Sequence, residues 1–156
     1  MALFGKREKA YEVWGDKPRW KEARQRLKDA GLDLVTRQPE APVTILADGR
    51  RLWRVFDNLM NNICKYAQPG TRVYINMENR DGKVEITFRN TSKYALNISS
   101  DELMERFVRG DSSRNTEGSG LGLSIANSLM ELMGGTCNLY VDGDLFKVEL
   151  WFDEEK

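Results

Sequence analysis

Two predicted β-hairpins constrain the fold of this chain more than any other feature. Residues 73–79 and 83–90 alternate apolar and polar side chains on either side of Asp81-Gly82, a dipeptide that favours a tight turn. Residues 138–142 and 145–152 repeat this pattern near the end of the chain. Because alternating strands bury only one face, the hairpins predict an antiparallel or mixed sheet with one face covered.

Helical stretches that can cover this face lie before and between the hairpins. Pro18 favours a helix start, Asp48 is a good N-cap, and Gly134-Gly135 favours a helix end. The predicted helices are residues 18–30, 48–66, 101–108 and 121–133, with short strands at 32–35 and 43–47 and a polar loop at 109–118. Helices and hairpins do not alternate regularly. The chain is therefore predicted to be an α+β protein, a two-layer sandwich whose mixed, mostly antiparallel sheet is covered by helices on one face.

The N-terminal part of the chain leaves two questions open. Residues 1–16 combine a charged stretch with an isolated apolar spot, which fits an added leader, the end of a linker or a short strand. In residues 17–31, Trp20, Ala23 and Leu27 recur at spacings that place them on one helix face. This face indicates ordinary core packing or the end of a longer helix whose remainder lies outside the chain.

The composition excludes several classes of protein. The 156 residues suit one domain, and 24 Lys and Arg balance 24 Asp and Glu, so no net charge points to nucleic acid or to an anionic membrane. No apolar run has the length of a membrane span. Cys64 and Cys137 are too few for a disulfide framework and are expected to be free thiols. The absence of His excludes His-dependent triads, His-ligated metals and a phospho-accepting histidine within this chain.

A glycine cluster, Gly118-Ser119-Gly120-Leu121-Gly122, precedes the last predicted helix. Unhindered backbone amides and the positive end of a helix dipole favour an anion, and phosphate is the obvious one. The cluster differs from the dinucleotide-binding pattern because its third glycine comes one residue early, and no Walker-type Gly-Lys-Ser/Thr follows. Taken alone, the cluster fits either a phosphate site or a flexible helix start with no ligand.

A polar stripe follows the helix predicted over residues 48–66. Asn58, Asn62 and Lys65 lie near one side of this helix, beside its apolar stripe, and Tyr66 follows them. An amide oxygen can ligate Mg²⁺, which takes further oxygens from water and substrate phosphates, and a lysine offers a point charge to phosphate. An ordinary polar face is the alternative, although an asparagine-rich helical segment is unfavourable by propensity.

Together with the segment between them, the polar stripe and the glycine cluster resemble the ATP-binding catalytic domain of bacterial sensor histidine kinases. This Bergerat-type fold is shared with DNA gyrase, heat-shock chaperone ATPases and mismatch-repair ATPases. The resemblance covers about Gly31 to Phe152, and the motifs occur in the family's order. They are residues 47–52 at the start of a helix, the N box at 58–66, the F box at 105–110, the second glycine box at 118–122 and the closing glycines at 134–135.

The resemblance implies a role for individual residues. Asn62 matches the asparagine that ligates Mg²⁺, while Asn58 and Lys65 match N-box residues that act near the phosphates and count as catalytic. Tyr66 matches the aromatic residue beside the nucleotide, and Asn90 occupies the position that meets adenine. The remaining matches, all expected to bind nucleotide, are Phe107 and Arg109 at the ATP lid and Gly118, Ser119, Gly120, Leu121 and Gly122 around the phosphates.

The adenine position departs from the family. The family's first glycine box reads Asp-x-Gly-x-Gly, and its Asp accepts a hydrogen bond from the adenine amino group. Here Asn90 replaces the Asp, Ser92 replaces the first glycine, and the second glycine is absent. Asn90 Oδ1 can still accept this bond, but a weaker one is expected because the acceptor is uncharged. Leu145, at a position where the family usually has Thr, is a second departure.

The resemblance implies that residues 32–156 form the catalytic domain of a protein-histidine kinase that uses ATP and Mg²⁺. Since the chain has no His, the acceptor must lie on a separate dimerisation domain, of which residues 17–31 would be the stub, with a response regulator downstream. No contact with nucleic acid or membrane is expected, and the implied location is cytoplasmic, with membrane anchoring of the parent protein left open. The alternatives are a degenerate nucleotide-binding or protein-interaction module, and an ATPase or serine kinase of the same superfamily.

Overall fold

From α1 onward, the described strands and helices follow the order predicted from the sequence. The computed structural model describes residues 10–14, 17–93 and 121–154. The elements in these ranges are β1 (Ala10–Val13), α1 (Lys17–Asp29), β2 (Asp33–Arg37), β3 (Val43–Leu46), α2 (Gly49–Tyr66), β4 (Arg72–Arg80), β5 (Lys83–Thr91), α4 (Leu121–Leu132), β6 (Thr136–Asp142) and β7 (Leu145–Asp153). The helix predicted over residues 101–108 and the loop over 109–118 lie outside the described residues.

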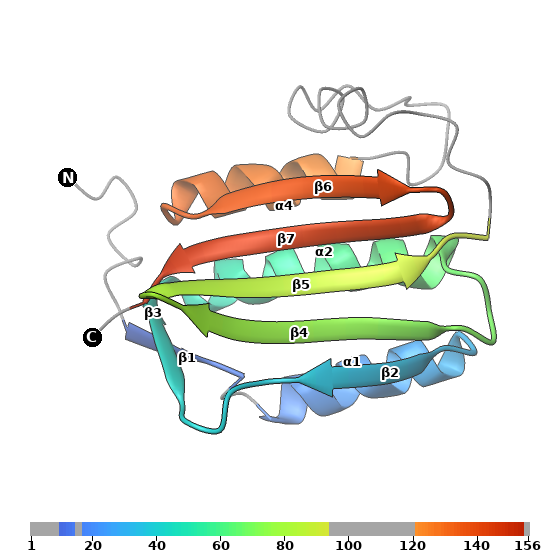
Figure 1. The fold of residues 1–156 in the computed structure, drawn as a ribbon, viewed down its shortest axis with the longest axis horizontal. Coiled ribbons are helices and arrows are strands. Elements are labelled where there is room, and N and C mark those ends of the chain that lie inside the picture. Colours follow the sequence, from blue (N-terminus) through green and yellow to red (C-terminus); the bar gives the residue numbers. More distant parts are fainter. Residues whose placement is uncertain (1–9, 15–16, 94–120, 155–156) are drawn as a thin grey trace.

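The main sheet has five strands in the order β2-β4-β5-β7-β6. Strand β2 runs parallel to β4, while the other neighbouring pairs are antiparallel. Helices α1, α2 and α4 lie together on one face of this sheet, and no described element covers the other face (Figure 1). The predicted α+β two-layer sandwich with a mixed, mostly antiparallel sheet is therefore confirmed.

Helix α2 is the central element of the helical layer. Asp48 caps its start, since the carboxylate accepts a hydrogen bond from the backbone N–H of Arg50 at 2.9 Å. The apolar stripe of the helix is buried against the sheet, with Phe56 and Phe88 in ring contact at 5.7 Å. Because this stripe faces the sheet, the polar residues beside it are directed along the margin of the core.

Helix α1 is part of the same core. Its predicted face is buried, with Trp20, Ala23 and Leu27 almost inaccessible to solvent. The Trp20 ring meets the ring of Trp53 in α2 edge-on at 4.9 Å. Core packing is therefore the interpretation of this face that the structure supports. Whether the helix also leads from a dimerisation domain stays a prediction.

A second, two-stranded sheet was not predicted. Strands β1 and β3 pair antiparallel, from Ala10 opposite Leu46 to Val13 opposite Val43. Of the alternatives left open for residues 1–16, a short strand is what Ala10–Val13 form. An isolated bridge between Ile45 and Glu154 places this small sheet beside the end of β7. Within the described ranges, no helix has both the length and the apolar character needed to cross a membrane.

Candidate nucleotide-binding site

The ends of α2 and β5 are joined by backbone hydrogen bonds. The N–H of Lys93 donates to the carbonyl of Tyr66 at 2.8 Å, and the N–H of Gln68 donates to the carbonyl of Thr91 at 2.8 Å. An isolated bridge pairs Ala67 with Ser92 between them. These contacts fix the polar C-terminal half of α2 against the end of the strand that carries Asn90.

A narrow, tightly packed crevice lies between α2, β5 and β7 at this junction, with no room for a water molecule inside it. Asn62 and Asn90, which were predicted from separate motifs, both line it. Its other walls are apolar and comprise Leu59, Ile63, Phe88, Phe146 and Val148. Two asparagines among apolar side chains match the composition of a small-molecule site, and a ligand can enter only when these walls move apart.

Asn90 is the most informative residue of this crevice. Its side chain is only 3% exposed, and its Oδ1 atom has no hydrogen-bond partner. An unpaired buried acceptor costs free energy, so most such groups in folded proteins are satisfied. An N–H donor on a bound ligand would satisfy this one, and the exocyclic amino group of adenine is such a donor.

The predicted N-box residues on α2 differ in how far they are exposed to solvent. Asn58 is half-buried and its Nδ2 atom also lacks a hydrogen-bond partner, whereas Asn62 is half-buried at the crevice wall. Lys65 is exposed, so its ammonium group can reach an anion outside the crevice. Tyr66 ends the helix and is partly buried.

The glycine cluster leads into α4, which packs against α2. Leu121 and Gly122 form the first turn of α4, as predicted, and this end of α4 lies at the same end of the molecule as the C-terminus of α2 (Figure 1). The other residues predicted for the lid and the phosphates lie outside the described residues: Phe107, Arg109, Gly118, Ser119 and Gly120.

The residues around the crevice fit a magnesium ion that is held chiefly by nucleotide phosphates. Among the described residues, no three His, Cys, Asp or Glu side chains are grouped so that they could hold a metal by themselves. Asn62 can supply one amide oxygen beside the crevice, and Mg²⁺ is commonly bound through few protein ligands with water and phosphate oxygens completing its shell.

The thiols do not provide a nucleophile for this site. Both cysteines are free, as predicted. Burial raises the pKa of the Cys64 thiol, while the nearby Arg26 guanidinium opposes that shift. Burial also raises the pKa of Cys137 to about 12. Both residues therefore remain protonated near neutral pH and are poor nucleophiles.

A roomier cleft of about 490 Å³ lies toward the opposite end of the strands, where Val13, Trp20, Pro39 and Met77 are among its lining residues. Size alone does not identify a site. The narrow crevice, and not this cleft, contains two of the three predicted asparagines, Asn62 and Asn90, and the buried unpaired Oδ1 of Asn90. The crevice is therefore the candidate site in the described part of the chain.

Two wall residues of the crevice were not predicted as site residues. Phe146 and Val148 lie on β7 and alternate with outward-facing residues. The period-two pattern of residues 145–152 places both on the buried face of the sheet. This pattern is the sequence signal that could have identified them as candidates. The sequence pattern does not indicate that this part of β7 lies beside β5 and opposite Asn62.

Comparison with known proteins identifies the family of the chain. Residues 47–156 match the family described as histidine kinase-, DNA gyrase B- and HSP90-like ATPases. The chain is 36% identical over 118 residues to the probable sensor protein PcoS of Escherichia coli, covering 73% of this chain and 25% of that protein. It is 34% identical over 114 residues to the signal transduction histidine-protein kinase BaeS of Escherichia coli (strain K12), covering 72% and 24% respectively.

Solved structures show the same fold. The catalytic domain of histidine kinase ThkA superposes with a TM-score of 0.76 at 18% identity, covering 94% of this chain and 95% of that chain. The mycobacterial sensor histidine kinase MprB gives a TM-score of 0.73 at 19% identity, covering 95% and 98%. The chain spans about a quarter of the length of the two sensor proteins above. With its family match and its fold in agreement, the chain belongs to the histidine kinase-, DNA gyrase B- and HSP90-like ATPases and has the catalytic-domain fold of the sensor histidine kinases.

Proposed function

We propose that this chain binds Mg-ATP and transfers its γ-phosphoryl group to a histidine on a separate dimerisation domain. In this transfer the bond between the γ-phosphorus and the bridging oxygen breaks, a bond to an imidazole nitrogen forms, and ADP leaves. The observation that carries the proposal is the unpaired, buried Oδ1 of Asn90 in a crevice shared with Asn62. Both residues lie where the family's nucleotide-contacting motifs fall.

The nucleotide is held at two ends in this proposal. Asn90 accepts a hydrogen bond from the adenine amino group, and the apolar walls of the crevice move apart to pack against the ring. Asn62 supplies an amide oxygen to the metal, and Lys65 and Asn58 lie on the same helix for contact with the phosphates. Bound Mg²⁺ supplies charge neutralisation at the phosphates, so catalysis depends mainly on positioning and electrostatics.

The remaining predicted residues complete the phosphate end. The backbone amides of Gly118, Gly120 and Gly122 cradle the phosphates at the start of α4, with Ser119 and Leu121 between them. The lid that begins at Arg109 would close over the nucleotide, with Phe107 at its base and Tyr66 beside the nucleotide at the helix end. A nucleotide whose adenine contacts Asn90 and whose phosphates contact Lys65 would span the junction between β5 and α2.

The proposed protein partners are those that supply a phosphoryl-accepting group that this chain lacks. It contains no His, so the acceptor belongs to another domain, and we propose that a response regulator receives the phosphoryl group afterwards. A cytoplasmic location is proposed because ATP is the phosphoryl donor, in a parent protein that is either soluble or membrane-anchored.

Calorimetric titration with a non-hydrolysable ATP analogue, with and without Mg²⁺, is the first test. Magnesium-dependent binding supports the proposal. A folded chain that binds neither form favours the alternative, a degenerate module that acts through protein contacts, which the exchange of the family's Asp for Asn90 motivates.

A second assay separates the kinase from the related ATPases and serine kinases. The chain is mixed with a histidine-containing dimerisation domain and ATP labelled in the γ-phosphoryl group. Label on the added domain that is stable to base and labile to acid indicates a phosphohistidine. Release of free phosphate without labelled protein indicates hydrolysis.

A further inference from the structure

A cross-strand row of side chains crosses the uncovered face of the sheet. The register places Tyr140 opposite Lys147, Lys147 opposite Arg89 and Arg89 opposite Tyr74. Tyr74 in turn lies opposite Val35 of the edge strand β2. We call Val35, Tyr74, Arg89, Lys147 and Tyr140 the cation–aromatic row. It includes one residue from every strand of the main sheet.

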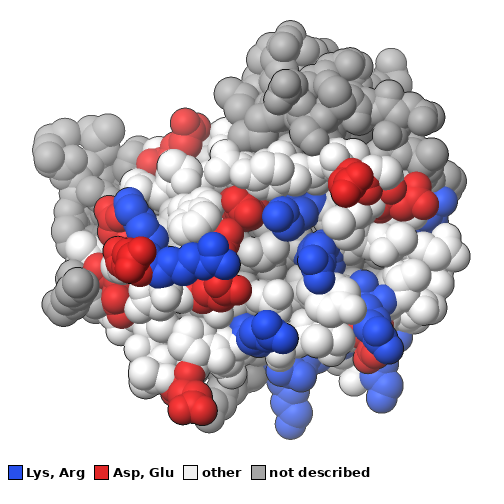
Figure 2. Space-filling view, viewed as in Figure 1, with Lys and Arg blue, Asp and Glu red and all other residues white. Residues whose placement is uncertain are grey.

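The centre of this row places two like charges side by side. Arg89 and Lys147 are directly opposite each other on neighbouring strands, an arrangement that destabilises a sheet unless another interaction compensates. Each cation lies over an aromatic ring, with Arg89 at 4.5 Å from Tyr74 and Lys147 at 4.8 Å from Tyr140. Figure 2 shows basic side chains, with acidic ones among them, over the middle of this face.

The two cations differ in how far they are neutralised. Lys147 Nζ lies 3.4 Å from Glu149 Oε2. Arg89 has no carboxylate within ion-pair distance among the described residues, so its charge is available to an external anion. The ends of the row are exposed hydrophobic side chains, Tyr140 at 43% and Val35 at 37%, and Glu149 lies close to the Tyr140 hydroxyl. Arg89, which lacks a carboxylate partner among the described residues, thus lies between the exposed hydrophobic side chains of Val35 and Tyr140.

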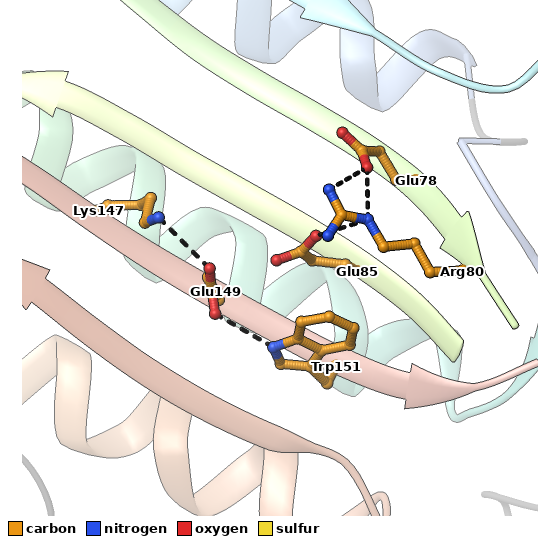
Figure 3. Close-up of polar contacts among 6 residues, drawn as sticks. All are labelled: Glu78, Arg80, Glu85, Lys147, Glu149 and Trp151. Atoms are coloured by element: carbon orange, nitrogen blue, oxygen red, sulfur yellow. Dashed lines mark hydrogen bonds and ion pairs between the residues drawn. The ribbon is translucent and has the colours of Figure 1, made fainter. Parts of the chain in front are cut away.

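Carboxylates beside the row limit the kind of anion that it can accept. Glu149 accepts a hydrogen bond from Trp151 Nε1 at 3.2 Å and pairs with Lys147, while Arg80 is held by Glu78 and faces Glu85 at 3.9 Å (Figure 3). These acidic groups would repel a long polyanion such as nucleic acid or an anionic membrane surface. A small number of carboxylates flanked by apolar side chains fits the row better.

We propose that the cation–aromatic row is a docking surface for an acidic, partly apolar segment of a partner protein. A carboxylate of that segment lies against Arg89 and Lys147, and neighbouring apolar side chains pack on Tyr140, Tyr74 and Val35. Arginine forms strong charge-assisted bonds with carboxylates, and Tyr and Arg are enriched at protein interfaces. The surface faces away from the crevice, because alternation along β5 places Arg89 on the opposite face from Asn90, which is buried beside α2.

The test is a titration of the isotopically labelled chain with a blocked peptide that alternates glutamate and leucine, followed by amide chemical shifts. A matched peptide of glutamine and leucine is the probe for apolar binding alone. The expected result is shifts in β5 and β7 around Arg89 and Lys147 with the acidic peptide, weakened by added salt. The double change Arg89→Gln and Lys147→Gln is expected to weaken binding roughly tenfold or more.

Two control variants make this test specific. Arg54→Gln removes an exposed cation from α2, on the other layer, and should leave peptide affinity unchanged. Arg89→Lys keeps the charge and should retain most of the binding if charge is what recognises the peptide. The proposal is overturned if shifts are absent, if they map to another surface, or if they persist in the double variant. It is also overturned if a single-stranded oligonucleotide of equal charge competes more strongly than the acidic peptide.

Discussion

Asn62 of α2 and Asn90 of β5 line the same crevice, although a turn, strand β4 and most of β5 separate them along the chain. The pairing of Ala67 with Ser92 and the hydrogen bond from Lys93 to Tyr66 bring their elements together. A ligand that contacts both amides therefore spans the junction of the helical layer and the sheet. Because Asn62 and Asn90 lie on different elements, the contribution of each to nucleotide binding can be measured with its own substitution.

Replacing Asn62 with Ala should lower affinity for a magnesium–nucleotide complex by roughly tenfold or more, because it removes a proposed metal ligand. The loss should be smaller when magnesium is omitted. Calorimetry with the non-hydrolysable analogue measures both values. Asn61→Ala is the matched control, since Asn61 is exposed and its Oδ1 only accepts a bond from Arg26 at 2.9 Å. Equal affinities for both variants and the wild type would remove the metal role from Asn62.

Replacing Asn90 with Asp should change binding and stability in opposite directions. A carboxylate accepts a stronger hydrogen bond from the adenine amino group, so we expect affinity to rise several-fold. The free domain should become less stable, because the introduced charge lies in a buried position with no partner. Titration and urea unfolding of the free chain check the two effects.

The control for this change is Asn76→Asp, the same substitution at a half-buried position on the outer face of β4. Neither nucleotide affinity nor stability should change by more than about 0.5 kcal/mol. A loss of affinity in Asn90→Asp, with the fold intact, would contradict the proposed contact with adenine.

Glu85 is expected to make stability depend on pH. Burial raises its pKa above the ordinary value of 4.5, and the nearby carboxylate of Glu149 adds to this shift, while Arg80 opposes it. The folded state therefore holds a proton that the unfolded state has released, so stability falls as pH rises from 4.5 through the raised pKa. Glu85→Gln should flatten this fall and be more stable than the wild type at neutral pH.

Urea unfolding at several pH values measures this effect as a difference between the two proteins. Glu22→Gln, at an exposed position on α1, removes one carboxylate elsewhere and should leave the pH dependence unchanged. If the Glu85→Gln and wild-type stabilities run parallel over this range, the Glu85 pKa in the folded protein is not raised.

Gly135 is expected to tolerate no side chain, because a Cβ atom there would lie 2.6 Å from the carbonyl oxygen of Trp151 and 2.8 Å from Met130 Cε. Gly135→Ala should cost about 1–3 kcal/mol of unfolding free energy through overpacking between α4 and β7. Gly143→Asn is a useful comparison, since Gly143 has a φ of +61° in open space and Asn tolerates that conformation. Denaturant unfolding that gives both variants the same stability would contradict the predicted clash.

The sequence alone predicts those helices and strands that are specified by short-range features such as turns and helix caps. The Asp81-Gly82 turn and the Asp48 cap specify β4, β5 and α2 through short-range chemistry, and these elements lie as predicted. The N-box asparagines could likewise be placed on one side of a helix from spacing alone. Their meeting with Asn90 followed from the family resemblance, since local patterns do not determine which strand end lies beside a helix end.

The features that escaped prediction depend on pairing between distant segments. The pairing of β1 with β3 needs tertiary contacts that a four-residue strand does not encode. The parallel neighbour of β4 is β2, a strand whose half-exposed alternation suits an edge but gives no partner. The same limit applies to the row of Arg89 and Lys147, because only the register of β5 and β7 sets the two cations opposite each other.

Leu27 tests whether α1 belongs to the folding unit of the catalytic domain. Its side chain is fully buried among core residues, so Leu27→Ala should cost about 2–5 kcal/mol through lost burial and the cavity that remains. Lys28→Ala, at the exposed neighbouring position, should change stability by no more than about 0.5 kcal/mol. A single cooperative urea transition that shifts only in Leu27→Ala would place α1 in the same unit as the sheet. A transition unchanged by Leu27→Ala would mean that the helix unfolds independently, as expected for a stub that belongs to another domain.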